Sequence, residues 1–272
     1  MCSVLNRIII VIAALGLFAA CSDKKKEEAN SILTEAKSLY EQGNYSEAMA
    51  LLDTIDNSYK EQVEIRRDAM HLRPQIIEKQ SLIELESTDS LIVTLSLESE
   101  KLKESLKKVD DGFEGYYTTI DLAGKIPADK DGLYARMSPD GVLSIISSAK
   151  KGTKSNSVRL SVGSEEASSG VVDADGERND RSLGQEIIIF MPEETAELCE
   201  FVANKYPQQF TLTFQGEKPY KINLDKKQAQ AIAELHSAAN IFRRLRVANL
   251  EKTRLEKQID IARSQMARTY RE

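Results

Sequence analysis

LESTDSLIVTLSLESEKLKESLKKV, residues 85–109, is the stretch that decides how the fold is read. Apolar and small residues recur in it at alternating steps of three and four positions: Leu85, Thr88, Ile92, Leu95, Ser99, Leu102, Leu106 and Val109. This spacing is a heptad seam, in which one side of a helix faces a partner helix. The stretch therefore predicts a supercoiled helix that needs a partner.

The end of the chain offers that partner. The same alternation runs from residue 238 to residue 266, through Ala238, Ile241, Leu245, Ala248, Lys252, Leu255, Ile259, Ala262 and Met266. Residues 78–111 are net acidic and the C-terminal segment is basic, and charges beside a seam select the partner. We expect the two helices to pair antiparallel within one chain, as a stalk of about 50 Å for some 35 residues. Two separate homodimeric coiled coils are the alternative.

A helical hairpin precedes the first stalk helix, within residues 31–111. The segment NSILTEAKSLYEQGNYSEAMALLDTID, residues 30–56, has two apolar runs with helical spacing around Gly43-Asn44. Its small and aromatic residues are spaced as in one tetratricopeptide repeat, which it resembles. Because such repeats stack in threes or more, the resemblance implies a single hairpin rather than a peptide-binding superhelix.

The period changes to two between residues 112 and 225, and turn residues become frequent. LYARM, SPDG and VLSII, residues 133–146, have the pattern of a strand, a turn and a second strand. Further strands are expected at 117–122, 157–162, 170–173, 183–190, 210–215 and 220–224, and Pro192 opens a helix to about Tyr206. We expect an α+β protein: an antiparallel β sandwich or half-barrel inserted into the stalk, with residues 226–272 as the returning helix.

The first 20 residues have the features of a secretion signal. Arg7 is their only charged residue, and the apolar run that follows is too short to span a bilayer. The stretch Phe18-Ala19-Ala20-Cys21 resembles the lipobox of bacterial lipoproteins, with Phe18 in place of the usual Leu. That resemblance implies cleavage before Cys21, acylation of Cys21 with palmitate-type chains and a lipid anchor. An ordinary signal peptide or an uncleaved anchor is the alternative.

The residues after Cys21 bear on location. By the sorting rules of the lipoproteins it resembles, Ser22 favours the outer membrane, and the charged run at residues 23–28 resembles export signals of Bacteroides-type surface lipoproteins. The periplasmic and the cell-surface face both stay open. We expect residues 21–30 to be a lipidated, flexible tether.

Composition limits the partners. The chain has 37 basic and 43 acidic side chains, and this mild acidity argues against nucleic acid. Cys2 leaves with the signal and Cys21 is acylated, so Cys199 has no cysteine left to pair with. Its helical spacing with Ala196 and Val202 predicts a buried structural thiol.

Few residues suggest a binding site. Tyr116 and Tyr117 lie between glycines where the stalk meets the β domain, and they could bind a ligand or partner or pack that joint. The acidic segment with Asp173, Asp175, Glu177 and Asp180 could bind calcium, although its glycine is out of place for an EF-hand, so a solvated loop is favoured. His71 and His236 lack a second ligand at helical spacing, which predicts no metal site.

The sequence thus predicts no enzyme and no cofactor, because it has neither a phosphate loop nor a nucleophile elbow. We expect an outer-membrane lipoprotein that acts as a structural or adaptor component of the cell envelope and contacts an envelope protein. The alternative is a glycan- or peptide-binding surface lipoprotein that uses its β domain. The oligomeric state stays open.

Overall fold

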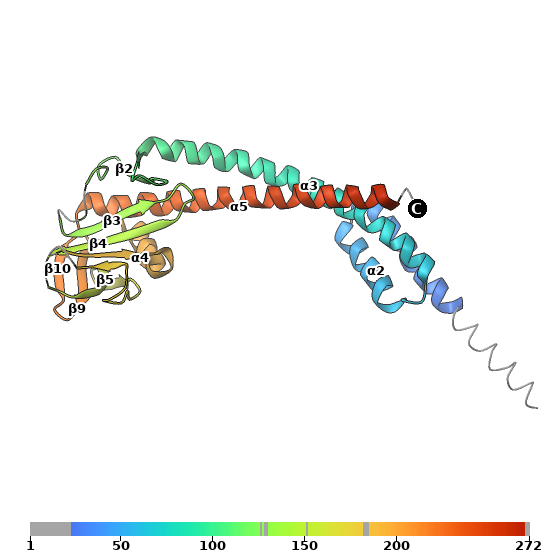
Figure 1. Ribbon diagram of the computed structural model, residues 1–272, viewed down its shortest axis with the longest axis horizontal. Helices are drawn as coiled ribbons and strands as arrows, with labels where there is room; N and C mark the ends of the chain where they lie inside the picture. The colour runs from blue at the N-terminus through green and yellow to red at the C-terminus, as the bar shows by residue number, and fades with distance from the viewer. Residues whose placement is uncertain (1–22, 126, 128–129, 151, 182–184, 270–272) are drawn as a thin grey trace, which may run out of the picture. The chain divides into compact units, whose positions relative to one another are not determined.

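The computed structural model describes residues 23–269 apart from 126, 128–129, 151 and 182–184. It has mixed α and β structure, with antiparallel sheets and long helices towards both ends of the chain (Figure 1). The chain divides into two compact units: unit 1 takes in the chain up to Asp89 and from Leu250 onward, and unit 2 is Ser90–Asn249. The divisions fall inside two long helices rather than at residues 112 and 225. The signal segment and Cys21 lie outside the described residues.

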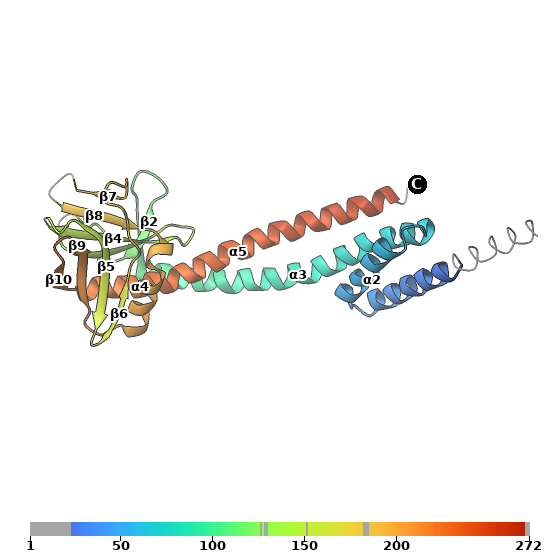
Figure 2. The ribbon, with the colours of Figure 1, turned by 90° about the horizontal axis from the view of Figure 1, so that it is seen from below.

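Unit 1 begins with the expected helical hairpin. A helix over residues 23–41 is followed by α2 (Tyr45–Ser58), and α2 lies beside the first part of α3 (Val63–Ser105) in Figures 1 and 2. Gly43 turns the chain with a φ of +81°, where a side chain would be strained. The predicted turn at Gly43-Asn44 is confirmed.

The core of this unit is rich in alanine. Its buried members are Ala29, Leu33, Ala36, Ala48, Leu52, Ile55, Ile65, Ala69, Leu72 and Ile76. Ala29 belongs to the stretch that we expected to be a flexible tether. That expectation is wrong for residues 23–30, which are helical, because Lys, Glu and Ala are good helix formers and Ala29 packs into the core.

The C-terminal helix α5 (Lys226–Thr269) also contributes to unit 1. Three ion pairs join it to α3, with nitrogen–oxygen distances of 2.8, 3.8 and 2.6 Å: Lys252–Asp89, Arg254–Glu84 and Arg263–Glu78. The residue numbers fall along α3 as they rise along α5, so the paired segments run antiparallel. The seam residues Leu255, Ile259 and Ala262 are buried.

The seam ends earlier than its spacing suggests. We expected a helix to residue 109, but α3 ends at Ser105 and Leu106–Val109 forms strand β1. Leu106 and Val109 fit the heptad by sequence, yet β1 pairs along its whole length with β2 (Tyr116–Thr119). Pairing with the neighbouring strand of a hairpin overrides the helical spacing of these four residues.

Unit 2 contains two antiparallel sheets, which are separated most clearly in Figure 2. The first has the order β1-β2-β3-β4-β8-β7. Its further strands are β3 (Gly132–Met137), β4 (Leu143–Lys150), β7 (Asn179–Asp180) and β8 (Gln185–Phe190). The second has the order β10-β9-β5-β6. Its strands are β5 (Ser155–Val162), β6 (Glu165–Ser168), β9 (Thr211–Gly216) and β10 (Tyr220–Asn223).

The strongest local patterns are confirmed in these sheets. The turn over residues 138–141 joins β3 to β4, and helix α4 (Pro192–Lys205) begins at the expected proline. The expected strand at residues 170–173 is wrong, because that segment follows β6 as a loop whose backbone bonds α4 and β5. The expected strand at 117–122 ends at Thr119, where the chain turns. Strands β6 and β7 are too short and polar to be predicted.

One core joins both sheets to α4 and α5. Phe210, Leu212 and Phe214 are buried in it, as their alternation predicts. A buried carboxylate on β8, Glu186, ties the sheets together: it accepts hydrogen bonds from the backbone N–H groups of Lys154 and Ser155 and from the hydroxyls of Thr153 and Ser155. This cross-link holds the start of β5 against β8.

Candidate functional site

The two tyrosines singled out from the sequence are engaged in packing. The Tyr117 ring lies edge-on to Phe242 of α5, with 5.7 Å between the ring centroids. The guanidinium of Arg136 lies 4.3 Å from the centroid of the Tyr116 ring. Both tyrosines therefore pack within unit 2, and the guanidinium covers one face of Tyr116.

The acidic loop has an anchoring role of its own. Asp173, Asp175, Glu177 and Asp180 are exposed, and among the described residues no group of three or more Asp, Glu, His or Cys side chains is arranged to hold a metal ion. The same loop contains Arg178, which donates two hydrogen bonds of 2.6 and 2.7 Å to the Glu194 carboxylate. Those bonds hold the pKa of Glu194 below its ordinary value.

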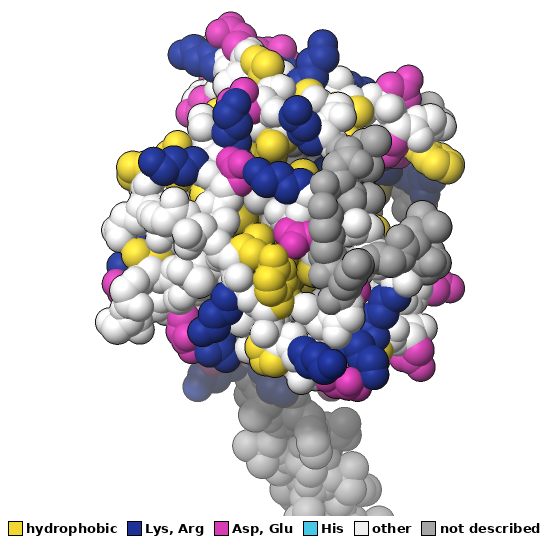
Figure 3. Space-filling view, turned by 90° about the vertical axis from the view of Figure 1, so that its left-hand side faces the viewer, with side chains coloured by type: hydrophobic (Ala, Val, Ile, Leu, Met, Phe, Trp, Pro, Cys, Tyr) yellow, Lys and Arg dark blue, Asp and Glu magenta, His cyan; other side chains and the backbone are white. Residues whose placement is uncertain are grey.

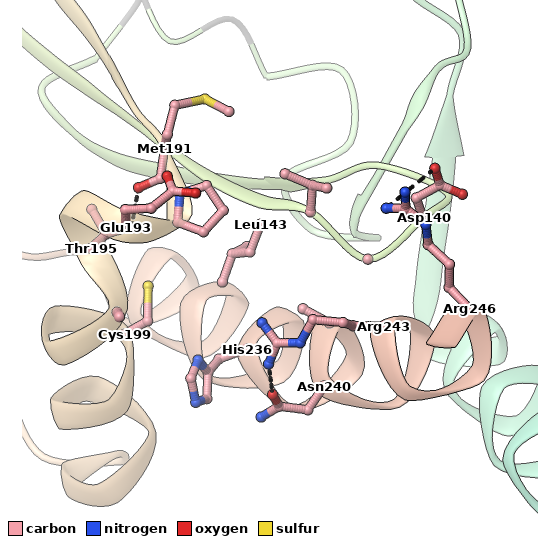
Figure 4. A pocket seen from close by; sticks show the side chains of 15 residues that line it. Asp140, Leu143, Met191, Glu193, Thr195, Cys199, His236, Asn240, Arg243 and Arg246 are labelled. Carbon is pink, nitrogen blue, oxygen red and sulfur yellow. Dashed lines mark hydrogen bonds and ion pairs between the residues drawn. The ribbon is translucent and has the colours of Figure 1, made fainter. Parts of the chain in front are cut away.

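A pocket of about 340 Å³ in unit 2 combines hydrophobic walls with cationic side chains (Figure 4). Three segments that are far apart in sequence form it: the start of β4 with the preceding turn, the first turns of α4, and the stretch of α5 from His236 to Arg246. Its lining residues are Asp140, Gly141, Val142, Leu143, Met191, Pro192, Glu193, Thr195, Ala196, Cys199, His236, Ala239, Asn240, Arg243 and Arg246.

The turn over residues 138–141 rests directly on α5. A Cβ atom at Gly141 would lie 2.8 Å from both the backbone nitrogen of Arg243 and the Cβ of Phe242, and the φ of Gly141 is +81°. Only glycine fits there without moving the helix. The close approach fixes Leu143 and Asp140 relative to the side chains of α5.

The opposite wall is the start of α4, and hydrogen bonds hold it in place. The Glu194 carboxylate accepts the Met191 backbone N–H at 2.8 Å while it binds Arg178, and the Gly170 N–H bonds the Glu194 carbonyl at 2.6 Å. Pro192 occupies the first turn, where its missing N–H costs no helix bond. This wall is therefore formed before any ligand arrives.

The floor of the pocket is not reactive. The side chains of Leu143, Cys199 and His236 converge on it in Figure 4. Burial raises the pKa of the Cys199 thiol to about 12, and this effect outweighs a hydrogen bond with Thr195 that acts to lower the pKa. Burial also lowers the pKa of His236, which keeps its ring neutral near pH 7. A protonated thiol beside a neutral imidazole suits apolar contact rather than nucleophilic attack.

Two arginines lie at the rim, and they differ in their partners. Arg246 faces Asp140 at 3.9 Å, whereas Arg243 hydrogen-bonds Asn240 of its own helix and forms no ion pair within the described part of the chain. A guanidinium has five N–H donors. Arg243 can therefore accept a carboxylate from outside without losing a partner.

Two more open pockets lie near the start of α5, and both have a more polar character. One is lined by residues that include Lys130, Tyr134 and Gln228, and the other by residues that include Gln209 and Tyr220. Lys130 already pairs with Asp225 at 2.7 Å. The face in Figure 3 mixes Lys and Arg with Asp and Glu around a small hydrophobic patch, so charges of the two signs are interspersed there.

The comparisons with known proteins add no relative: no family model matches the chain, and no curated protein or solved structure matches it. Within the described residues, no helix combines the length and hydropathy of a membrane span. Cys21 lies outside those residues.

Sequence reasoning missed the pocket as a site. It placed Cys199 in the interior, which is confirmed at 2% exposure, and it placed His236 on a helix. The residues that approach each other come from three separate segments, 140–143, 191–199 and 236–246, and no local period links them. The one local signal was the Ser-Pro-Asp-Gly turn followed by Leu143, which predicted a hairpin but not what it packs against.

Proposed function

We propose that the protein is an outer-membrane lipoprotein that serves as an adaptor of the cell envelope, anchored through Cys21 and without a catalytic step. The support for the anchor is the sequence of residues 1–28, with its short apolar run, small residues before Cys21 and charge immediately after. Acyl chains on Cys21 would hold the protein at the membrane, since each buried CH₂ contributes about 0.8 kcal/mol.

The finer architecture is part of this proposal. We infer that α3 and α5 form an antiparallel coiled-coil stalk and that the two sheets pack as a sandwich. The three ion pairs in unit 1, the burial of Leu95 and Ala248 in unit 2, and the core shared by both sheets support it. In this arrangement the stalk gives reach and unit 2 makes the contact.

The pocket of unit 2 carries the adaptor hypothesis. It offers hydrophobic walls, a preformed helix start and the Arg243 guanidinium, which hydrogen-bonds Asn240 but forms no ion pair within the described residues; this combination suits an apolar side chain beside a carboxylate. A protein segment supplies both groups. A glycan has less support, because Tyr116 and Tyr117, the aromatic residues considered for sugar stacking, are engaged by Arg136 and Phe242.

Replacement of the acylation site tests the anchor. Cys21→Ala should abolish incorporation of labelled palmitate and release the protein from the membrane fraction, with Ser22→Ala as the matched control. Persistent labelling of the Cys21→Ala protein would overturn the lipoprotein proposal.

Filling the pocket tests the adaptor site. Leu143→Trp should occupy the space between α4 and α5, and it should remove envelope proteins that co-purify with the anchored wild-type chain under mild detergent. Val171→Trp, at a side chain that is 63% exposed elsewhere in unit 2, is the control. Hydrogen exchange checks that each variant is folded. Unchanged co-purification with Leu143→Trp would contradict the assignment of the pocket.

A further inference from the structure

The loop between β1 and β2 presents the most exposed large hydrophobic side chain of the described residues. Phe113 is 92% exposed in the loop Asp110–Gly115. Phenylalanine contributes a large apolar area, and full exposure forgoes the favourable free energy of burying it. Single exposed apolar residues are common, so exposure alone assigns no role to it.

The loop around Phe113 is held in shape, which sets it apart. The Asp111 carboxylate accepts the backbone N–H groups of Phe113 and Gly115 at 3.1 and 3.0 Å, and the Asp110 carboxylate accepts that of Gly112 at 2.9 Å. Gly112 and Gly115 have φ values of +83° and +73°. A side chain at Gly115 would also lie 2.7 Å from the Val109 carbonyl oxygen. The ring is thus presented by a preorganised loop, which reduces the entropy cost of binding.

The strand register places this loop at the same end of the sheet as the pocket. Val109 pairs with Tyr116, and Tyr117 pairs with Met137 at the end of β3. Both pairs lie at the same end of the sheet. Beyond that end, the chain forms the Phe113 loop between β1 and β2 and, next to it, the turn over residues 138–142 after β3. Asp140, Gly141 and Val142 of that turn line the pocket. A projecting aromatic side chain and a receiving pocket therefore lie at one edge of unit 2.

The two features also complement each other chemically. The pocket has hydrophobic walls, a volume of about 340 Å³ and, at its rim, Arg243, whose guanidinium forms no ion pair among the described residues. The loop offers one aromatic ring flanked by Asp110 and Glu114, both exposed. When a self-complementary patch carries both elements, a two-fold axis lets each copy give its ring and receive that of its partner.

We propose that the pocket of one chain receives Phe113 from a second copy, with Glu114 against Arg243, so that two copies of unit 2 exchange their β1–β2 loops. The inference rests on the proposed function, because it names the protein segment that the pocket binds. Aromatic residues inserted in a pocket and ringed by polar contacts are the usual centres of protein interfaces. Each site is completed by a residue of the other copy.

Sedimentation velocity of residues 21–272 with Cys21→Ser tests the proposal across a dilution series. The wild-type chain should dimerise, and Phe113→Ala should weaken dimerisation by about thirtyfold or more, as for a central aromatic residue. Ile120→Ala, at a side chain that is 63% exposed in the same unit, should leave it unchanged. A monomer at every concentration, or a dimer insensitive to Phe113→Ala, would overturn the exchange.

Directed cross-linking identifies the contact. In a Cys199→Ala background, chains with Glu114→Cys should form a mixed disulfide with chains carrying Arg243→Cys, in preference to either homodimer. Exclusive homodimer bands would contradict the proposed pairing.

Binding of a peptide with the sequence of residues 108–116, KVDDGFEGY, distinguishes this inference from the proposed function. Binding that is lost with Arg243→Glu, while the full chain stays monomeric, would overturn the exchange of loops and retain a pocket for protein segments. Absence of peptide binding together with unchanged co-purification in Leu143→Trp would remove both.

Discussion

The two units are stabilised by cores of different construction. The core of unit 1 is made of alanines and aliphatic side chains from helices that follow one another in the chain, with α5 returning beside them. The core of unit 2 collects Phe190, Phe210 and Phe214 with aliphatic residues from two sheets and two helices. The buried residues of the first core come from one stretch of the chain, Ala29 to Ile76, whereas those of the second are spread from Leu106 to Phe242.

That difference bears on where a site can form. Helices with small core residues pack closely and leave little space between them. In unit 2, a turn, a helix start and a helix side meet at different angles, and a pocket is left where they meet. The preformed Phe113 loop also belongs to unit 2. Both proposed contact sites therefore lie in unit 2, and the following predictions test the contrast between the units.

The largest expected effect concerns Cys199. A thiol pKa of about 12 lowers the thiolate fraction about a thousandfold relative to an exposed cysteine, so alkylation at pH 8 should be slower by at least that factor. Mass spectrometry of iodoacetamide adducts measures it, in a chain with Cys21→Ser. A Cys199→Ala chain with Val171→Cys is the fast control. Rapid alkylation of Cys199 would mean that unit 2 opens locally.

The next prediction separates the two cores. Phe214→Ala should reduce the opening free energy of β5 and β9 by about 3–5 kcal/mol, because it leaves a large cavity. Hydrogen exchange followed by mass spectrometry should show α2 unchanged. Leu52→Ala is the matched variant and should lower protection in α2 while sparing β9. Equal losses in both units from either variant would mean a single cooperative core.

Glu186 should make the free energy of unfolding of unit 2 decrease at low pH. Burial acts to raise the pKa of this carboxyl, but its hydrogen bonds to residues 153–155 hold the pKa below the ordinary value. The stabilisation is therefore complete above the unfolded-state pKa and is lost as pH falls through the folded-state pKa. Glu186→Gln should cost about 1.5–3 kcal/mol at pH 7 and reduce this acid dependence.

Urea unfolding at pH 7 and at stepwise lower pH measures the effect of Glu186→Gln. Asp175→Asn, at an exposed carboxyl of the acidic loop, should leave both the stability and its pH profile unchanged. An identical acid profile for wild type and Glu186→Gln would contradict the role of this carboxylate.

The smallest effect is expected in the ion pairs of unit 1. Asp89→Asn and Lys252→Gln should each leave the urea midpoint equal to that of the wild type within experimental error. Both side chains are partly solvated, and the pair is screened by salt. The double variant should match the single ones. A large loss on breaking this pair would show that charge, rather than the apolar seam, holds the α3 and α5 segments of unit 1.

The sequence predicts those features of the fold that short local patterns determine. Gly43, Pro192 and the alternation of Phe210, Leu212 and Phe214 act over a few residues, and each is confirmed. Leu106 and Val109 continue a helical spacing but form β1, because Tyr116 and Thr119 pair with them from across a turn. A helical period that is followed along one segment does not take such a partner strand into account.

The candidate site shows the same limit. Helical spacing correctly predicted that Cys199 is buried. It could not predict that Cys199 would approach His236 and Leu143, because that depends on how the β3–β4 turn packs on α5 through Gly141. Of the two tyrosines, Tyr117 packs on Phe242 of α5, the helix that lines the pocket, whereas Tyr116 packs against Arg136 of β3.

Site-specific photo-crosslinking in living cells tests the central claim, that the pocket of unit 2 is a protein-binding site. A photoreactive phenylalanine at Val142, on the pocket rim, should yield protein adducts that disappear when Arg243→Glu is added. The same probe at Val171 should yield none. Adducts that form equally at both positions, or that persist with Arg243→Glu, would contradict the claim.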